Sequence, residues 1–82
     1  MKNILIIGAG VAGCDVAREI NRDSSVGLKV VGFIDDDPKK AEKFIYGIKV
    51  LGGGGELREI VDRLSVEEII IAIPSAHGEE IR

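Results

Sequence analysis

Three glycines near the N-terminus have the spacing of a phosphate-binding turn. Gly8, Gly10 and Gly13 form a G-x-G-x-x-G pattern directly after the apolar run Ile4–Ile7 and open an amphipathic segment. The first glycine permits a tight turn, the second lets a pyrophosphate approach the backbone, and the third lets a helix pack closely on a strand. Unpaired backbone N–H groups and the helix dipole attract the anion. We therefore predict a phosphate-binding turn of six residues: Gly8, Ala9, Gly10, Val11, Ala12 and Gly13.

A carboxylate follows the second strand-like run, Lys29–Ile34, at the distance expected for a ribose-binding acid. Asp35 lies 22 positions after Gly13, and the expected spacing is about 20 residues. A carboxylate there accepts hydrogen bonds from ribose hydroxyls and repels a 2′-phosphate, which favours NAD or another unphosphorylated ribose over NADP. We predict Asp35 as the ribose acceptor and Asp36 as its substitute. The alternative is a solvated turn, in which an aspartate caps a short helix before Pro38.

The composition is that of one small folded domain. The chain has 82 residues, a net charge of −3, 45% hydrophobic residues and one cysteine. Lys and Arg are not clustered, which argues against a nucleic-acid surface. The sequence shows no metal-ligand cluster, no secretory signal and no apolar run of the roughly 20 residues that a membrane span needs. We expect a cytoplasmic domain covering residues 1–82, cut from a longer protein that is itself cytoplasmic or attached to the cytoplasmic face of a membrane.

Strand-like and helix-like segments alternate along the chain. After the strand Ile4–Ile7, the apolar pattern predicts these further elements: a helix over Val11–Asp23, the strand Lys29–Ile34, a short helix over Lys39–Phe44, a strand at Ile48–Leu51, a helix around Leu57–Leu64 and a strand at Glu67–Ile73. The unbroken apolar run of the last strand is typical of a parallel strand covered on both faces. This order predicts a three-layer α/β fold of the Rossmann type, reduced to its first half, with a short parallel sheet of about four strands ordered 3-2-1-4.

The carboxyl ends of three predicted strands fall at Gly8, Asp35 and Pro74-Ser75. Strand order reverses there, and ligands of open α/β sheets bind at such a point. The fourth strand would be an exposed edge, where a second copy of the chain could pair.

No other residues complete a catalytic centre. Tyr46 and Lys49 are one residue short of a Y-x-x-x-K pair, and His77 has no visible partner. Cys14 is better explained by packing than by reactivity. The four glycines Gly52–Gly55 lack the Lys and Ser or Thr of a phosphate loop, so we interpret them as a mobile connection. The sequence thus predicts a nucleotide-binding module without its own catalysis.

Three stretches together resemble a known family. They are VVGFIDDDP at residues 30–38, GIKVLG at 47–52 and IIAIPSA at 70–76. They are similar to the CoA-binding-like, NAD-binding Rossmann domain of bacterial polysaccharide biosynthesis proteins, the nucleoside-diphosphate-sugar epimerases and 4,6-dehydratases. The resemblance implies that this domain precedes a separate catalytic domain, often after a membrane-spanning region. It also implies that Gly8, Gly10 and Gly13 contact phosphate, that Asp35 contacts a ribose, and that Ile73, Pro74 and Ser75 flank the ligand.

The sequence leaves the ligand and the parent protein open. NAD, CoA and a UDP-sugar each present a pyrophosphate and a ribose to the same backbone. Two other parents fit similar strands: a redox-sensing repressor, whose Rossmann domain senses a ligand, and a sugar acyltransferase that binds a nucleotide-sugar. A structural domain without a ligand is the remaining alternative, and the intact Gly8, Gly10 and Asp35 argue against it.

Overall fold

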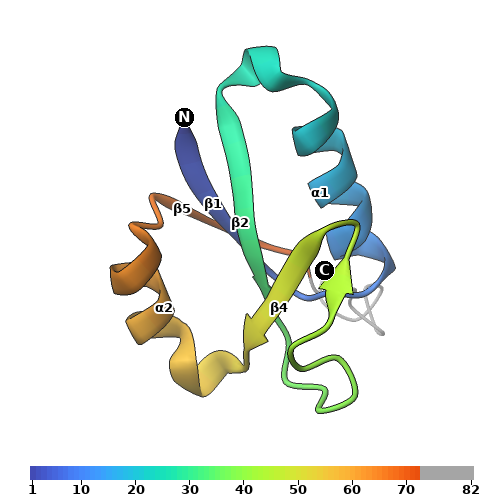
Figure 1. Ribbon diagram of the computed structural model, residues 1–82, viewed down its shortest axis with the longest axis vertical. Coiled ribbons are helices and arrows are strands. Elements are labelled where there is room, and N and C mark those ends of the chain that lie inside the picture. The colour runs from blue at the N-terminus through green and yellow to red at the C-terminus, as the bar shows by residue number, and fades with distance from the viewer. Residues whose placement is uncertain (73–82) are drawn as a thin grey trace, which may run out of the picture.

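The computed structural model describes residues 1–72 and gives them an α/β architecture (Figure 1). The elements in chain order are β1 (Lys2–Ile7), α1 (Val11–Arg22), a 3₁₀ turn (Ser24–Val26), β2 (Leu28–Ile34), β3 (Phe44–Ile45), β4 (Ile48–Gly52), a second 3₁₀ turn (Gly54–Glu56), α2 (Leu57–Leu64) and β5 (Glu68–Ile71). The strand order is β3-β4-β2-β1-β5. Strands β4, β2, β1 and β5 pair in parallel, which confirms the predicted fold class and, for these four strands, the order 3-2-1-4. A fifth strand, β3, pairs antiparallel with β4, so the sheet is mixed and not all parallel as predicted.

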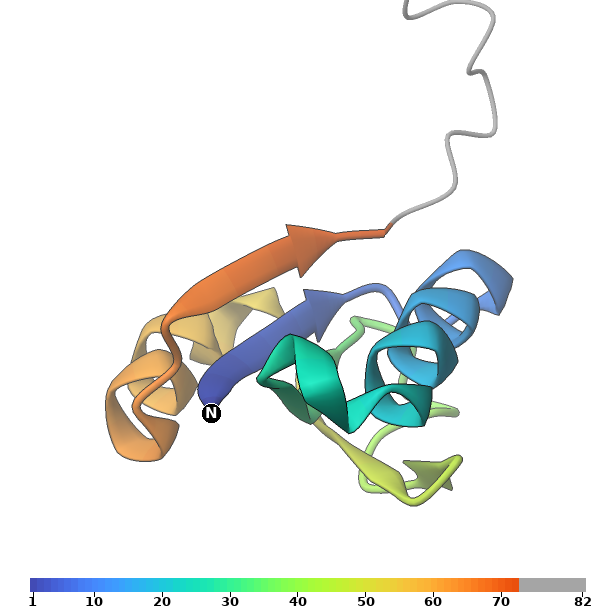
Figure 2. The ribbon, with the colours of Figure 1, turned by 90° about the horizontal axis from the view of Figure 1, so that it is seen from above.

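The two helices cover opposite faces of the sheet (Figure 2). On the α1 face, Ile4 and Ile6 of β1 pack with Phe33 and with Ala17 of the helix. On the α2 face, Leu5 packs with Ile34 and Ile60. Alternate residues of a strand point to opposite faces, so an unbroken apolar strand serves both cores.

Strand β2 contains one residue more than β1 along the length where they pair. Ile4 lies opposite Val30 and Leu5 lies opposite Gly32, which leaves Val31 without a partner residue on β1. An extra residue of this kind is a β-bulge. Because of it, Val30 and Phe33 both face the α1 core although they are three residues apart.

The short helix predicted over Lys39–Phe44 is wrong. This segment makes turns and then enters β3, which pairs antiparallel with β4. The N–H of Glu42 donates to the Val50 carbonyl at 3.1 Å, and the Val50 N–H donates to the Lys43 carbonyl at 2.8 Å. These bonds engage the backbone groups that a helix would have used, and Glu42 has a φ of 66°, outside the helical region.

A tight hairpin joins β3 to β4, and it was not predicted. Its two central residues, Tyr46 and Gly47, have φ values of 52° and 77°. A two-residue hairpin turn of type I′ needs positive φ at both positions, and glycine is favoured at the second. The Tyr-Gly pair between two apolar runs was the available signal.

The prediction that β5 is covered on both faces is also wrong: within residues 1–72, one face of this strand is exposed. Ile69 is 40% exposed and Ile71 is 71% exposed, and both lie beside the β1 residues that face α2. Helix α2 packs over the middle of the sheet instead. Within the described part β5 is an edge strand (Figure 2). Its pairing with a second copy stays a prediction.

Candidate functional site

Backbone hydrogen bonds hold the carboxyl ends of the parallel strands side by side. The N–H of Gly8 donates to the Ile34 carbonyl at 2.7 Å, and the N–H of Asp35 donates to the Gly52 carbonyl at 2.9 Å. The N–H of Ala72 donates to the Ile7 carbonyl at 2.8 Å. The glycine turn and the acidic turn therefore meet at one end of the sheet. The predicted site residues Ile73, Pro74 and Ser75 lie outside the described residues, as does His77.

A hollow of about 320 Å³ opens at this end of the sheet. Its size is at the lower end of the range for ligand sites. Four predicted site residues line it, Gly8, Gly10, Asp35 and Asp36, and they are joined by Ile7, Ile34, Lys40 and Gly54. The walls thus combine backbone, two apolar side chains and three charged ones.

The three glycines of the turn meet different physical needs. Gly8 has a φ of 107°, a conformation that side chains rarely adopt. A Cβ on Gly13 would lie 1.8 Å from the Gly8 carbonyl oxygen, so this glycine allows α1 to pack on the end of β1. A Cβ on Gly10 would meet nothing within 4 Å. The fold itself therefore does not require glycine at position 10. A ligand that lies against the backbone would require it, because a side chain would occupy the same space.

The start of α1 is open to an anion. Gly10 is the residue that caps the helix, and no side chain accepts a hydrogen bond from the first turn. That turn also contains no acidic residue. The first N–H groups of any helix lack partners within it, and the helix dipole adds positive potential. The predicted residues Val11 and Ala12 do not line the hollow, and Val11 is 79% exposed, so only their backbone N–H groups are suited to the predicted role.

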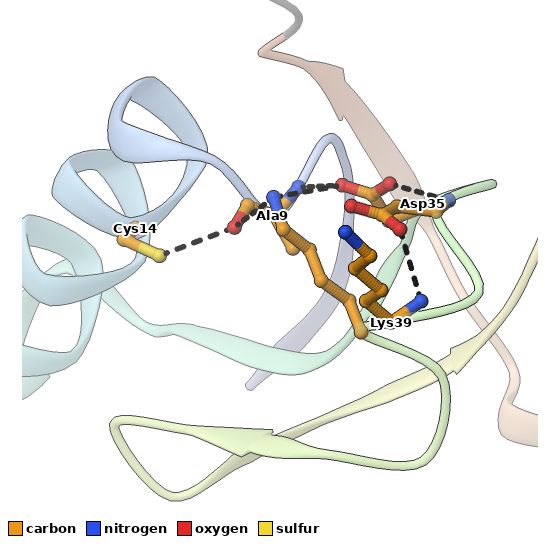
Figure 3. Close-up of polar contacts among 6 residues, drawn as sticks. Ala9, Cys14, Asp35 and Lys39 are labelled. Atoms are coloured by element: carbon orange, nitrogen blue, oxygen red, sulfur yellow. Dashed lines mark hydrogen bonds and ion pairs between the residues drawn. The ribbon is translucent and has the colours of Figure 1, made fainter.

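Asp35 joins the acidic turn to the glycine turn (Figure 3). Its Oδ2 accepts a hydrogen bond from the Ala9 N–H at 2.9 Å, and its Oδ1 accepts one from the Asp37 N–H at 2.9 Å. Burial raises the pKa of Asp35, but these two hydrogen bonds and the nearby Lys40 ammonium lower it more, so the net pKa is below its usual value. Asp35 is therefore ionised at neutral pH, and each oxygen keeps room for a further donor.

Asp36 and Asp37 bind backbone groups of their own surroundings. Oδ1 of Asp36 accepts a hydrogen bond from the Gly54 N–H at 2.8 Å, which ties the acidic turn to the glycine-rich connection. Oδ1 of Asp37 accepts one from the Lys39 N–H at 2.9 Å, so Asp37 caps a turn rather than a helix. The connection we interpreted as mobile has a defined path, because the Glu56 carboxylate also accepts a hydrogen bond from the Gly53 N–H at 3.0 Å.

Sequence reasoning missed four lining residues: Ile7, Ile34, Lys40 and Gly54. Lys40 and Gly54 come close to the glycine turn or to Asp36 only through the fold, and the signal in the sequence was no more than a basic pair after three acids. Cys14 packs at the start of α1, where its thiol lies 3.7 Å from the Ala9 carbonyl and burial raises the pKa of the thiol. A raised pKa disfavours the reactive thiolate. In residues 1–72 no three metal-ligating side chains converge, and neither helix is long and apolar enough to cross a membrane.

This fold and this site define a nucleotide-binding domain of the Rossmann type. The chain belongs to the family described as CoA-binding domain, whose model matches residues 1–82. It is 38% identical over 78 residues to the probable polysaccharide biosynthesis protein EpsC of Bacillus subtilis, and 35% identical over 75 residues to the capsular polysaccharide biosynthesis protein CapD of Staphylococcus aureus. These alignments cover 95% and 90% of this chain, but only 13% and 12% of the two relatives.

Three other similarities come from a regulator and from two solved structures. The redox-sensing transcriptional repressor Rex of Thermotoga petrophila is 33% identical over 79 residues, which are 95% of this chain and 37% of that protein. The crystal structure of UDP-D-quinovosamine 4-dehydrogenase from Vibrio fischeri superposes with a TM-score of 0.81 at 31% identity, covering 92% of this chain and 59% of that one. A structure of RSP in complex with β-NADH gives 0.78 at 22% identity, covering 98% of this chain and 38% of that one, and shows the shared fold. The resemblance to polysaccharide biosynthesis proteins is confirmed.

Proposed function

We propose that this chain binds the adenosine diphosphate part of a nucleotide and serves a polysaccharide biosynthesis enzyme that acts on nucleotide-sugars. The parent would be a 4,6-dehydratase or epimerase whose catalytic residues lie in another domain. NAD is the ligand we favour, and CoA and a UDP-sugar are the alternatives. The observation that carries the proposal is the hollow between the start of α1, where no side chain caps the helix, and the carboxylate of Asp35.

Each part of the ligand has a counterpart in the hollow. The pyrophosphate would lie against Gly10, where the backbone has open space, and would accept hydrogen bonds from the N–H groups of the first turn of α1. A ribose hydroxyl would donate to Asp35, which is ionised and keeps acceptor capacity. The apolar Ile7 and Ile34 line the same hollow and suit the flat face of a base.

Titration of the 82-residue chain with ADP, NAD, CoA and a UDP-sugar, followed by backbone amide shifts, tests this proposal. We expect shifts at residues 8–13 and at Asp35. Gly10→Ala should weaken binding by roughly tenfold or more, because a methyl group would occupy the space of the pyrophosphate. It should lower the stability of the fold by at most about 1 kcal/mol, since alanine caps a helix less well than glycine.

Gly55→Ala is the matched control for this variant. It makes the same chemical change where a Cβ also meets nothing within 4 Å, at a residue that does not line the hollow. Its binding should equal that of the unaltered chain. Equal binding by Gly10→Ala, or no shift at residues 8–13 with any ligand at millimolar concentration, would contradict the proposal.

The similarity to redox-sensing repressors supports a second candidate. In it the domain binds NAD as a signal, and a change in ligand occupancy alters a partner domain. The two candidates share the ligand site and differ in what the domain is attached to. The gene that encodes the full-length protein distinguishes them, because one predicts a downstream sugar-modifying domain and the other an upstream DNA-binding domain.

A further inference from the structure

A lysine lies between the ribose-binding acid and the glycine turn. Lys40 comes from the turn after β2, and its Nζ donates a hydrogen bond to the Ala9 carbonyl at 3.4 Å. The same Nζ lies 3.7 Å from Oδ2 of Asp35, with the lysine side chain 34% exposed and the carboxylate 18% exposed. Lys40 lines the hollow together with Asp35. Figure 3 shows the polar contacts between Ala9 and Asp35 in this region.

Asp35 does not depend on Lys40 for its hydrogen bonds. Both carboxylate oxygens already accept backbone N–H groups, from Ala9 and from Asp37. An ammonium has three N–H donors, and the Ala9 carbonyl accepts from one of them. Lys40 therefore keeps donors beside the hollow, and a partly exposed ion pair contributes little to stability. Its position suits contact with a ligand better than support of the fold.

The charges of the residues around the hollow determine whether a second phosphate group could bind beside Asp35. The carboxylates of Asp36 and Asp37 are directed at backbone donors, the N–H groups of Gly54 and Lys39. Among the lining residues that the structure describes, Lys40 is the only cation. With Asp35 alone, a phosphate on the bound ribose would meet a negative charge. The ammonium of Lys40 beside that carboxylate offsets the repulsion and provides a donor.

We propose that Lys40 binds a phosphate monoester carried on the adenosine ribose, so that the site accepts nucleotides phosphorylated on that ribose in spite of Asp35. The inference rests on the proposed function, because it needs the ribose beside Asp35. From the sequence we expected Asp35 to repel a 2′-phosphate. That expectation considered Asp35 without Lys40, and the inference changes it. The 3′-phosphate of CoA and the 2′-phosphate of NADP are the two forms of this chemistry.

The test uses two pairs of ligands that differ by one phosphate. Dephospho-CoA and CoA differ at the 3′ position, and NAD and NADP differ at the 2′ position. We expect Lys40→Gln to weaken CoA, NADP or both by roughly tenfold, since it removes a charge-assisted contact. The unphosphorylated partner of each pair should change by less than about threefold. A loss confined to one pair assigns the position of the phosphate, and Lys40→Arg should retain most of the binding.

Lys43→Gln is the control, because it removes the same charge from the same segment at an exposed residue that does not line the hollow. Its four affinities should stay unchanged. The inference is overturned if Lys40→Gln weakens both members of each pair equally, or if Lys43→Gln has the same effect as Lys40→Gln. If none of the four ligands shifts the amides of residues 8–13, the proposed function fails and the inference fails with it. If NAD or dephospho-CoA binds but Lys40→Gln weakens neither CoA nor NADP, the proposed function stands and the inference alone is refuted.

Discussion

Replacing Gly13 with alanine tests whether α1 rests on the end of β1. The added Cβ would lie 1.8 Å from the Gly8 carbonyl oxygen and 2.9 Å from the Gly8 carbonyl carbon. Both are backbone atoms, so no side-chain rotation can relieve the clash. Either α1 moves away from β1 or the turn at Gly8 changes shape.

The expected loss of stability is about 2 kcal/mol. Overpacking a tight interior site costs typically 1–3 kcal/mol, and a clash with backbone belongs near the upper limit, at about 3 kcal/mol. Alanine is favoured over glycine within a helix by about 1 kcal/mol, which offsets part of this cost. A domain of this size has a total stability of roughly 4–12 kcal/mol, so the loss would be a large fraction of it.

Urea unfolding followed by circular dichroism measures this change. We expect a lower midpoint with an unchanged slope, and a melting temperature lower by roughly 10 °C. Gly55→Ala serves as the control, because its Cβ would have open space, and it should lie within about 0.5 kcal/mol of the unaltered chain. If Gly13→Ala is as stable as that control, α1 does not pack on the turn as described and the explanation of the third glycine is refuted.

Three further predictions concern the acidic turn and the edge strand. The pKa of Asp35 is lowered in the fold, so its charge stabilises the protein above the unfolded pKa of about 4, and this stabilisation is lost as the pH falls through the folded pKa. Asp35→Asn should therefore lower the free energy of unfolding by about 1–2 kcal/mol at pH 7 and reduce the loss of stability at acid pH. An unchanged acid dependence of stability would contradict this. Asp36→Ala should cost about 1 kcal/mol or less and speed amide exchange at Gly54, whose N–H would lose its acceptor; unchanged exchange there would show that the bond is not formed. Ile71→Gln should change the free energy of unfolding by no more than about 0.5 kcal/mol, because this side chain is 71% exposed, and a loss above ~2 kcal/mol would show that the side chain is buried.

The fold and half of the hollow could be predicted because they depend on local patterns. The run Ile4–Ile7, the glycine spacing and the position of Asp35 each constrain the backbone over a few residues, and parallel topology then brings their ends together. Strand β3 could not be predicted in this way. It has two residues, and its hydrogen bonds depend on pairing with β4 rather than on its own propensity. Lys40 was missed for a related reason, since its hydrogen bond to the glycine turn is with Ala9, 31 positions earlier in the chain.

The charged residues after β2 share one pattern in sequence and have different partners in space. Asp35 binds the glycine turn, Asp36 binds the glycine-rich connection, and Asp37 shapes the turn that carries Lys40. In the sequence, spacing favours Asp35 for the ribose and Asp36 as its substitute, but it does not show which backbone groups each aspartate binds. Those partners are known only from the fold.

The extra residue in β2 links the core of the protein to the candidate ligand site. Up to Val30, the even-numbered residues of the strand face α1. After the extra residue Val31, the odd-numbered residues face α1 instead. This switch puts Phe33 in the α1 core and presents Asp35 to Ala9. Deleting Val31 would remove this switch. Val30 could then not remain buried in the α1 core while Asp35 stays at the glycine turn. A change in the length of this strand is therefore incompatible with both the core and the candidate site.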